Sequence, residues 1–128
     1  MLLASAGIIL RNDKILLLQR THFTKRYPNH WGCPGGKALP DETPEENAIR
    51  EIKEECNLDF TPTEILKIGR WNGKKFYRFL GDWEGNVIIQ EEEVQNYKWC
   101  SFEEAKKLKI SFDYHEVLDL LLDRELII

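Results

Sequence analysis

The sequence predicts a layered α/β or α+β domain in which strands are mixed with a few helices. Segments with the apolar patterns of strands recur along the chain, and capping sequences open the helical segments. The length of 128 residues suits one domain, so we expect residues 1–128 to form a single domain. A composition that is 42% hydrophobic and 31% charged excludes a disordered or fibrous chain.

The first strands are expected at residues 2–10 and 14–20, joined as a hairpin by a tight turn at Asn12-Asp13. Residues 21–42 are expected to form a long irregular stretch, because prolines and glycines interrupt them repeatedly. A loop of that length in a compact domain is typically functional.

A helix is predicted from Pro44 to about Cys56. Thr43 suits the N-cap, Pro44 the first helical position, and Glu46 the position that closes a capping box. Asn57 suits the left-handed position that ends a helix.

The second half of the chain contains three further expected strands, at 63–71, 74–83 and 86–90, with an Asn72-Gly73 hairpin turn between the first two. A short strand is expected at 97–100. Ser101 should cap a brief helix, and residues 112–123 have the amphipathic pattern of another.

Cysteine usage and charge exclude several classes of protein. The three cysteines (Cys33, Cys56 and Cys100) form no CxxC pair, which argues against a disulfide scaffold or thiolate zinc site and favours a cytoplasmic location. The apolar start, residues 1–10, is too short to span a bilayer and is interpreted as a strand. Outside residues 36–58 the charges balance, which argues against a membrane or general nucleic-acid surface.

The net charge of −4 comes entirely from residues 36–58, which hold seven carboxylates and three bases. Within the predicted helix, Glu51, Glu54 and Glu55 fall in a sector about 100° wide, separate from the apolar stripe of Ala48, Ile49, Ile52 and Cys56. Such a cluster destabilises a helix unless a cation compensates it. Oxygen ligands without histidine or cysteine favour Mg²⁺ or Mn²⁺. A solvated acidic face paired with Arg50 and Lys53 is the alternative.

The residues from Gly36 to Leu58, GKALPDETPEENAIREIKEECNL, resemble the Nudix box. That pattern is Gly, five residues, Glu, seven residues, then Arg-Glu-apolar-any-Glu-Glu-any-Gly-apolar. Every fixed position matches except Asn57, where the family has Gly, and Asn tolerates the same backbone conformation. The resemblance extends to Trp31–Lys37 and to the later segments around Phe79–Leu80 and Trp99–Cys100.

The resemblance implies an α/β/α sandwich with a mixed β-sheet between helices, and hydrolysis of a nucleoside diphosphate linked to a further group. It implies that Glu51 and Glu55 are the main metal ligands and that Glu54 is a third ligand or the general base. The Gly35 carbonyl matches a backbone ligand, and Arg50 and Glu42 match an orienting pair next to Gly36. The catalytic set implied is therefore Glu51, Glu54 and Arg50. Relatives also carry an acidic ligand before a late strand, where Glu93 is our choice; a charged edge loop is the alternative reading of Glu91–Glu93.

Residues 14–40 contain no acid but carry five bases with aromatic residues between them. A basic loop of this kind could hold phosphates that the metals leave exposed. Arg20 matches a substrate-contacting Arg of related triphosphatases, and Lys37 could reach the same groups. Phe23 and Tyr27 are candidates for stacking on a base, whereas Trp31 is expected in the core. Tyr114 lies near the base-reading position of relatives.

The substrate predicted by this resemblance is a nucleoside triphosphate, cleaved to a monophosphate and pyrophosphate as in MutT-type enzymes. The later segment is also similar to diadenosine tetraphosphate hydrolases, and a non-catalytic nucleotide-binding module is a third hypothesis. The partner expected is a small nucleotide, with RNA limited to 5′-triphosphate or capped ends. The oligomeric state is left open.

Overall fold

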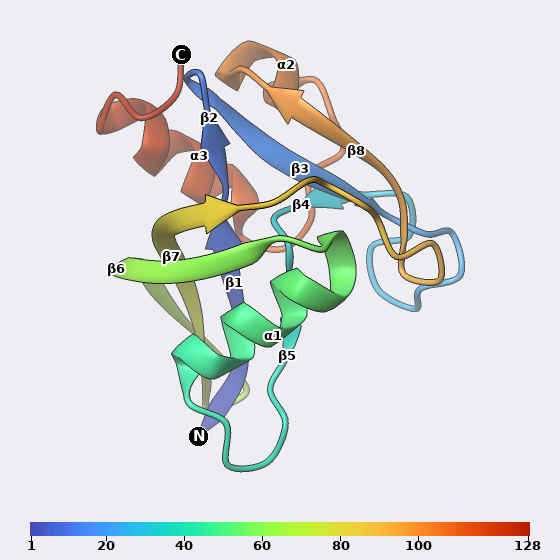
Figure 1. Ribbon diagram of the computed structural model, residues 1–128, viewed down its shortest axis with the longest axis vertical. Coiled ribbons are helices and arrows are strands. Elements are labelled where there is room, and N and C mark those ends of the chain that lie inside the picture. The colour runs from blue at the N-terminus through green and yellow to red at the C-terminus, as the bar shows by residue number, and fades with distance from the viewer. The chain divides into compact units, whose positions relative to one another are not determined.

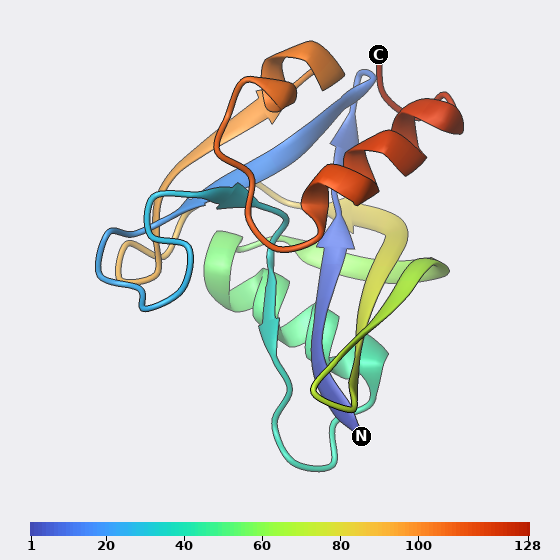
Figure 2. The same cartoon turned by 180° about the vertical axis from the view of Figure 1, so that it is seen from behind.

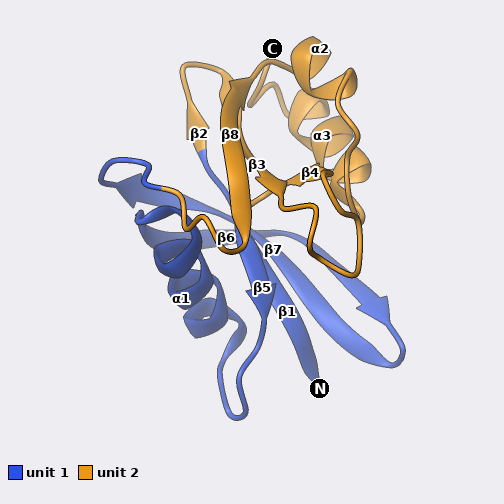
Figure 3. Ribbon diagram, turned by 90° about the vertical axis from the view of Figure 1, so that its right-hand side faces the viewer, with its two compact units in different colours: residues 1–9, 34–88 blue, residues 10–33, 89–128 orange.

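A computed structural model describes all residues, 1–128, as two compact units (Figures 1 and 3). Unit 1 comprises residues 1–9 and 34–88, and unit 2 comprises residues 10–33 and 89–128. The chain has a mixed α/β fold, as the sequence predicted. None of its helices is long and apolar enough to cross a membrane.

Unit 1 contains a four-stranded sheet in the order β5-β1-β7-β6. Its strands are β1 (Leu2–Ile8), β5 (Gly35–Lys37), β6 (Asp59–Trp71) and β7 (Lys74–Glu84). The sheet is mixed because β1 runs parallel to β7, whereas β1 with β5 and β6 with β7 are antiparallel. The helix α1 (Pro44–Cys56) packs against β1, β5 and β6.

The contact between α1 and β1 explains which residues form the core of unit 1. Ala48, Ile52 and Cys56 are fully buried, as the apolar stripe predicted. Ile49 was assigned to the same stripe, but its side chain is 42% exposed, so that part of the prediction is wrong. Gly7 of β1 lies against Ile52, where a Cβ would have no space. The close approach of strand and helix therefore requires glycine.

Unit 2 contains β2 (Leu10–Arg11), β3 (Lys14–Arg20), β4 (Trp31–Gly32) and β8 (Val94–Cys100). β3 pairs antiparallel with each of the other three strands. Its residues 15–18 are all buried, which is the continuous apolar pattern of a central strand. The short helix α2 (Phe102–Lys106) and α3 (Tyr114–Asp123) complete this unit.

The predicted N-terminal hairpin is only partly correct. Asn12 and Asp13 have the positive φ angles of a tight turn, and β2 pairs with β3 across it. The expected strand 2–10 is divided at Ile9, however, because β1 pairs with β5 and β7 of unit 1. Local sequence could not reveal this, since the partner strands of β1 come from distant parts of the chain.

Other boundaries also differ from the expectations. The stretch 21–42 contains β4 and β5, and residues 86–90 form no strand. β6 begins at Asp59 instead of residue 63, and Pro62 is accommodated because β6 lies at the sheet edge and is irregular there. β6 and β7 form a long hairpin around the predicted Asn72-Gly73 turn (Figure 2).

Candidate functional site

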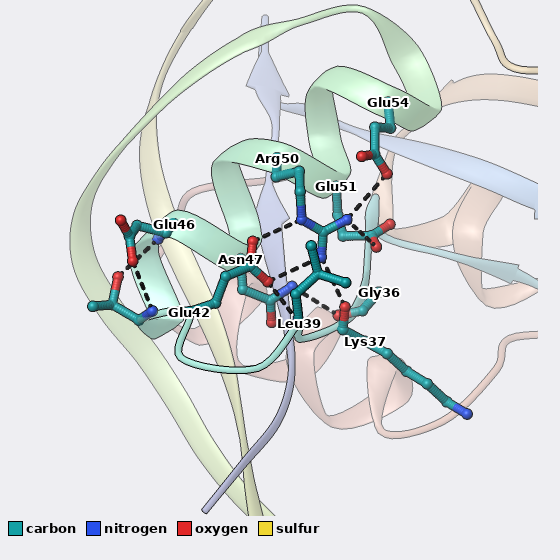
Figure 4. Close-up of polar contacts among 10 residues, drawn as sticks. Gly36, Lys37, Leu39, Glu42, Glu46, Asn47, Arg50, Glu51 and Glu54 are labelled. Atoms are coloured by element: carbon teal, nitrogen blue, oxygen red, sulfur yellow. Dashed lines mark hydrogen bonds and ion pairs between the residues drawn. The ribbon is translucent and has the colours of Figure 1, made fainter.

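The start and end of α1 follow the local rules that the sequence indicated. Thr43 accepts a hydrogen bond from the Glu46 backbone, and the Glu46 side chain accepts one from the Thr43 backbone, which completes the capping box. Asn57 has a φ of 68° and ends the helix in the left-handed conformation. The helix therefore presents Arg50, Glu51 and Glu54 in a defined register (Figure 4).

Arg50 lies at the centre of a network of carboxylates (Figure 4). Its Nε and Nη2 donate to the two oxygens of Glu42 at 2.7 and 3.0 Å, a bidentate pair. Its Nη1 donates to Glu51 at 2.9 Å and to Glu54 at 3.1 Å. Nη2 also donates to the Lys37 carbonyl at 2.9 Å, so Arg50 connects α1 to β5. The predicted pairing of Arg50 with Glu42 is present in the structure.

The same contacts shift the protonation equilibria of this pair. The hydrogen bond from Arg50 lowers the pKa of Glu42, and the Leu39 backbone N–H adds to this effect. Glu42 in turn raises the pKa of Arg50, with a further contribution from Glu51. Both side chains are therefore charged at neutral pH.

Glu51 and Glu55 form the pair best placed to bind a cation. One carboxylate oxygen of each lies within 4.8 Å of the other. Glu55 accepts a hydrogen bond of 2.7 Å from the Gly35 backbone N–H, which orients its carboxylate toward β5. A Cβ at Gly36 would lie 2.5 Å from Oε2 of Glu51, so glycine is required for Glu51 to lie against the strand.

The oxygen-only donor set of Glu51 and Glu55 fits Mg²⁺ or Mn²⁺ better than zinc. Two carboxylates at this distance repel each other, and a divalent cation would remove that repulsion. Glu54 belongs to a different environment, because it is 57% exposed and shares Nη1 of Arg50 with Glu51. The structure thus distinguishes the Glu51–Glu55 pair, which could hold a cation, from the more exposed carboxylate of Glu54.

Asn47 is a site residue that sequence reasoning missed. It is fully buried, and its Nδ2 donates to the Gly36 carbonyl at 3.2 Å. Its Oδ1 has no hydrogen-bond partner, which is costly for a buried polar atom. The only sequence signal was an amide side chain one helical turn before Glu51.

The remaining predicted residues lie outside this network. The Lys37 side chain is exposed, and only its backbone carbonyl joins the Arg50 contacts. Glu93 belongs to unit 2, where its backbone carbonyl accepts a hydrogen bond from Thr21 ahead of β8. The roles of Glu93 and of the Gly35 carbonyl as metal ligands stay predictions.

In unit 2 two of the predicted substrate residues, Arg20 and Tyr27, both contact Phe112. The guanidinium of Arg20 lies 5.3 Å from the Phe112 ring centre, and the ring of Tyr27 lies 4.6 Å from it. Phe23 is 79% exposed and packs on His22. The side chain of Tyr114 is only 5% exposed and packs against Gly32 in the core.

A substrate contact by Tyr114 stays a prediction. The neighbouring Phe112, 38% exposed, presents an aromatic ring at the surface of this segment instead. Trp31 is buried, as its sequence context predicted.

Comparison with known proteins identifies relatives along nearly the whole chain. Residues 1–121 match the profile of the NUDIX domain. The chain is 33% identical to CTP pyrophosphohydrolase of Escherichia coli (strain K12) over 103 residues, covering 78% of this chain and 76% of that one. It is 30% identical to the asymmetrical bis(5′-nucleosyl)-tetraphosphatase of Caenorhabditis elegans, covering 94% of this chain and 93% of the relative.

Some relatives are considerably longer. Diphosphoinositol polyphosphate phosphohydrolase 3-alpha of Mus musculus is 30% identical over 108 residues, and the match covers 77% of this chain but only 61% of that protein. Among solved structures, the solution structure of the E. coli ORF135 protein has a TM-score of 0.74 at 28% identity, covering 94% of this chain and 87% of the other.

Proposed function

The chain belongs to the Nudix family, and on that premise we propose that it hydrolyses a pyrophosphate bond of a nucleotide with the help of a divalent cation. The observation that carries the proposal is the Glu51–Glu55 carboxylate pair, held by Arg50 and by the Gly35 backbone. We further propose that residues 1–128 form one domain, because the matched residues 1–121 include parts of both compact units. A cytoplasmic location is also part of the proposal, supported by three cysteines that are all free.

The proposed roles follow from the contacts of each side chain. Glu51 and Glu55 would hold Mg²⁺ or Mn²⁺, with the Gly35 carbonyl and Glu93 as further ligands. The bound cation would neutralise phosphate charge and lower the pKa of the attacking water. Glu54 is the proposed general base, because its exposed carboxylate can accept the proton of that water.

Arg50 and Glu42 act on the carboxylates and not on the substrate in this proposal. The five hydrogen bonds that Arg50 donates hold Glu51 and Glu54 in one orientation, and Gly36 leaves the space that Glu51 occupies. Arg20 and Lys37 are the proposed phosphate contacts. Phe23 and Tyr27 are the proposed stacking residues for the base.

The substrate that we propose is a nucleoside triphosphate. Water attacks phosphorus, the bond between the α-phosphorus and the bridging oxygen breaks, and the products are a nucleoside monophosphate and pyrophosphate. The likeness to CTP pyrophosphohydrolase supports this choice. The similarity to the asymmetrical tetraphosphatase over 94% of the chain supports a second candidate, a dinucleoside polyphosphate.

Product analysis distinguishes these candidates. The purified protein would be incubated with Mg²⁺ and, in parallel, with nucleoside triphosphates, diadenosine tetraphosphate, ADP-ribose and 5′-triphosphorylated or capped RNA. We expect a monophosphate and pyrophosphate from a triphosphate, whereas faster release of ATP and AMP from diadenosine tetraphosphate would establish the second candidate. No turnover of any substrate would refute the enzymatic proposal in favour of a nucleotide-binding module.

The proposed site is tested separately with isosteric variants. We expect Glu54→Gln and Glu55→Gln each to lower kcat by about 10²–10⁴, because one removes a general base and the other a charged ligand. Glu45→Gln is the matched control, since Glu45 is exposed in the first turn of the same helix. Full activity in both site variants would rule out the assignment, whatever the substrate.

A further inference from the structure

Two polar side chains of unit 1 are fully buried where α1 packs against β1 and β5. Ser5 of β1 and Asn47 of α1 each have an exposed fraction of 0%. The Oγ of Ser5 and the Oδ1 of Asn47 have no hydrogen-bond partner within the chain. Buried polar atoms are nearly always hydrogen-bonded, so two such atoms in one interface require an explanation.

Both side chains lie beside Gly36. Ser5 is directly opposite Gly36 in the antiparallel pairing of β1 with β5, so the two residues project to the same face of the sheet. That face is the one covered by α1, because a Cβ on Gly36 would meet Glu51. Asn47 lies one helical turn before Glu51, and its Nδ2 donates to the Gly36 carbonyl at 3.2 Å (Figure 4). Asn47 thus joins α1 to β5, whereas Ser5 belongs to the neighbouring strand and its hydroxyl forms no hydrogen bond.

Asparagine is an unfavourable residue at position 47 unless its amide group has a role. It has a lower helix propensity than alanine, and its buried Oδ1 loses the hydrogen bonds that water gives it in the unfolded chain. An alanine would carry neither cost. The hydrogen bond from Nδ2 to the Gly36 carbonyl is the polar contact that offsets them.

The strand that Asn47 contacts is weakly constrained by its own pairing. β5 is three residues long, begins with two glycines and lies at the edge of the sheet, where β1 is its only partner strand. Glycine has more backbone freedom than any other residue. Both proposed cation ligands depend on this strand, because Glu55 accepts a hydrogen bond from the Gly35 N–H and Glu51 lies against Gly36. A shift of β5 would therefore move the two carboxylates relative to each other.

We propose that Asn47 is a positioning residue for the Glu51–Glu55 pair. Its amide holds the Gly36 carbonyl, and this contact keeps β5 at the distance from α1 at which one oxygen of each carboxylate binds the same cation. Asn47 itself binds neither the cation nor the substrate in this proposal. The inference rests on the proposed function, because it takes the Glu51–Glu55 pair as the cation site. Removing a group that orients metal ligands typically lowers metal affinity by about 10–100-fold.

Cation binding can be measured without any substrate. Mn²⁺ is titrated into the full-length protein, and the electron paramagnetic resonance signal of free Mn²⁺ gives the Kd. We expect Asn47→Ala to raise this Kd about tenfold. Asn47→Leu fills the space of the amide without supplying a donor and should raise the Kd to a similar extent. Ser5→Ala is the matched control, because it removes the other unpartnered polar atom of the same interface, and its Kd should equal that of the wild type.

The Mg²⁺ dependence of hydrolysis provides a second readout. In both Asn47 variants the Mg²⁺ concentration that gives the half-maximal rate should rise about tenfold. The kcat at saturating Mg²⁺ should stay close to that of the wild type, because excess cation fills the weakened site by mass action. A role of Asn47 in stability alone would lower Tm and leave the Kd for Mn²⁺ and the Mg²⁺ requirement unchanged.

Three results would overturn the inference. These are equal Kd values for Mn²⁺ in the wild type and both Asn47 variants, an equal rise of the Kd in Ser5→Ala, or failure of both Asn47 variants to fold, as judged by circular dichroism. A rise of the Kd in the Asn47 variants of a protein that hydrolyses no nucleotide would refute the proposed function and still support this inference. The absence of Mn²⁺ binding by the wild type would refute both.

Discussion

Replacing Arg50 with lysine tests whether the guanidinium geometry, and not only its charge, organises the site. Arg50 donates five hydrogen bonds, two to Glu42 and one each to Glu51, Glu54 and the Lys37 carbonyl. A lysine ammonium has three donors on one atom and cannot reproduce the planar fork. At least two of the five bonds must therefore be lost in Arg50→Lys, and those to Glu42 depend most on the fork.

The expected magnitude follows from the burial of the partners. A hydrogen bond to a charged group contributes about 1.5–3 kcal/mol, and solvent screening reduces this toward the lower value at partly exposed sites. The side chains of Arg50 and Glu42 are 23% and 13% exposed. We therefore expect the free energy of unfolding to fall by about 2–4 kcal/mol, which for a chain of this length lowers Tm by about 10 °C.

Thermal and urea unfolding followed by circular dichroism would measure this loss, and nucleotide hydrolysis would be measured on the same preparations. We expect kcat to fall as well, because Glu51 and Glu54 lose their common donor. Arg70→Lys is the matched control, since Arg70 is exposed without an ion pair and should change stability by less than about 0.5 kcal/mol. A Tm for Arg50→Lys equal to that of the control would refute the reasoning.

Three further measurements address other parts of the structure. Millimolar Mg²⁺ should raise the free energy of unfolding of the wild type, by about 2.7 kcal/mol when Mg²⁺ is in hundredfold excess over its Kd. The increase should be smaller for Glu51→Gln. An equal rise in Tm in both proteins would show that Glu51 does not belong to the site. Because Arg50 lowers the pKa of Glu42, their pairing stabilises the fold above the unfolded pKa of about 4.3 and is lost as pH falls through the folded pKa. Glu42→Gln should therefore show a weaker loss of stability in acid than the wild type, and identical urea-unfolding profiles from about pH 3 to pH 6 would contradict this. Burial raises the pKa of the Cys56 thiol to about 12. Alkylation of Cys56 by iodoacetamide should therefore be far slower in the folded than in the urea-unfolded protein. Rapid labelling of Cys56 in the folded protein would contradict its burial.

Sequence reasoning predicted best where short-range rules dominate. The capping box at Thr43 and Glu46, the left-handed Asn57 and the turn at Asn72-Gly73 are all confirmed, because each depends on residues a few positions apart. Strand pairing was predicted less well. The division of the first strand at Ile9 and the pairing of Gly35-Gly36 with β1 depend on residues far apart in the chain.

The candidate site shows the same distinction. The spacing of Glu51, Glu54 and Glu55 indicated that three carboxylates share one face of α1, but not that Glu54 would differ from the other two. That difference arises because Glu55 is held by the β5 backbone, whereas Glu54 is 57% exposed and accepts a hydrogen bond from Arg50. Sequence position alone likewise placed Tyr114 near the base-reading position of relatives, but did not indicate that the packing of unit 2 would bury its ring against Gly32.

The amino-acid sequence alone thus determined the α1 helix, its ends and the family to which its acidic segment belongs, since periodicity and capping are encoded within a few helical turns. Only the tertiary structure decided which carboxylates face each other, which of them Arg50 orients, and that Asn47 contacts the Gly36 carbonyl. These contacts depend on the close packing of α1 against β5 and β1. The spacing of residues that are near one another in the sequence does not predict packing between such distant segments.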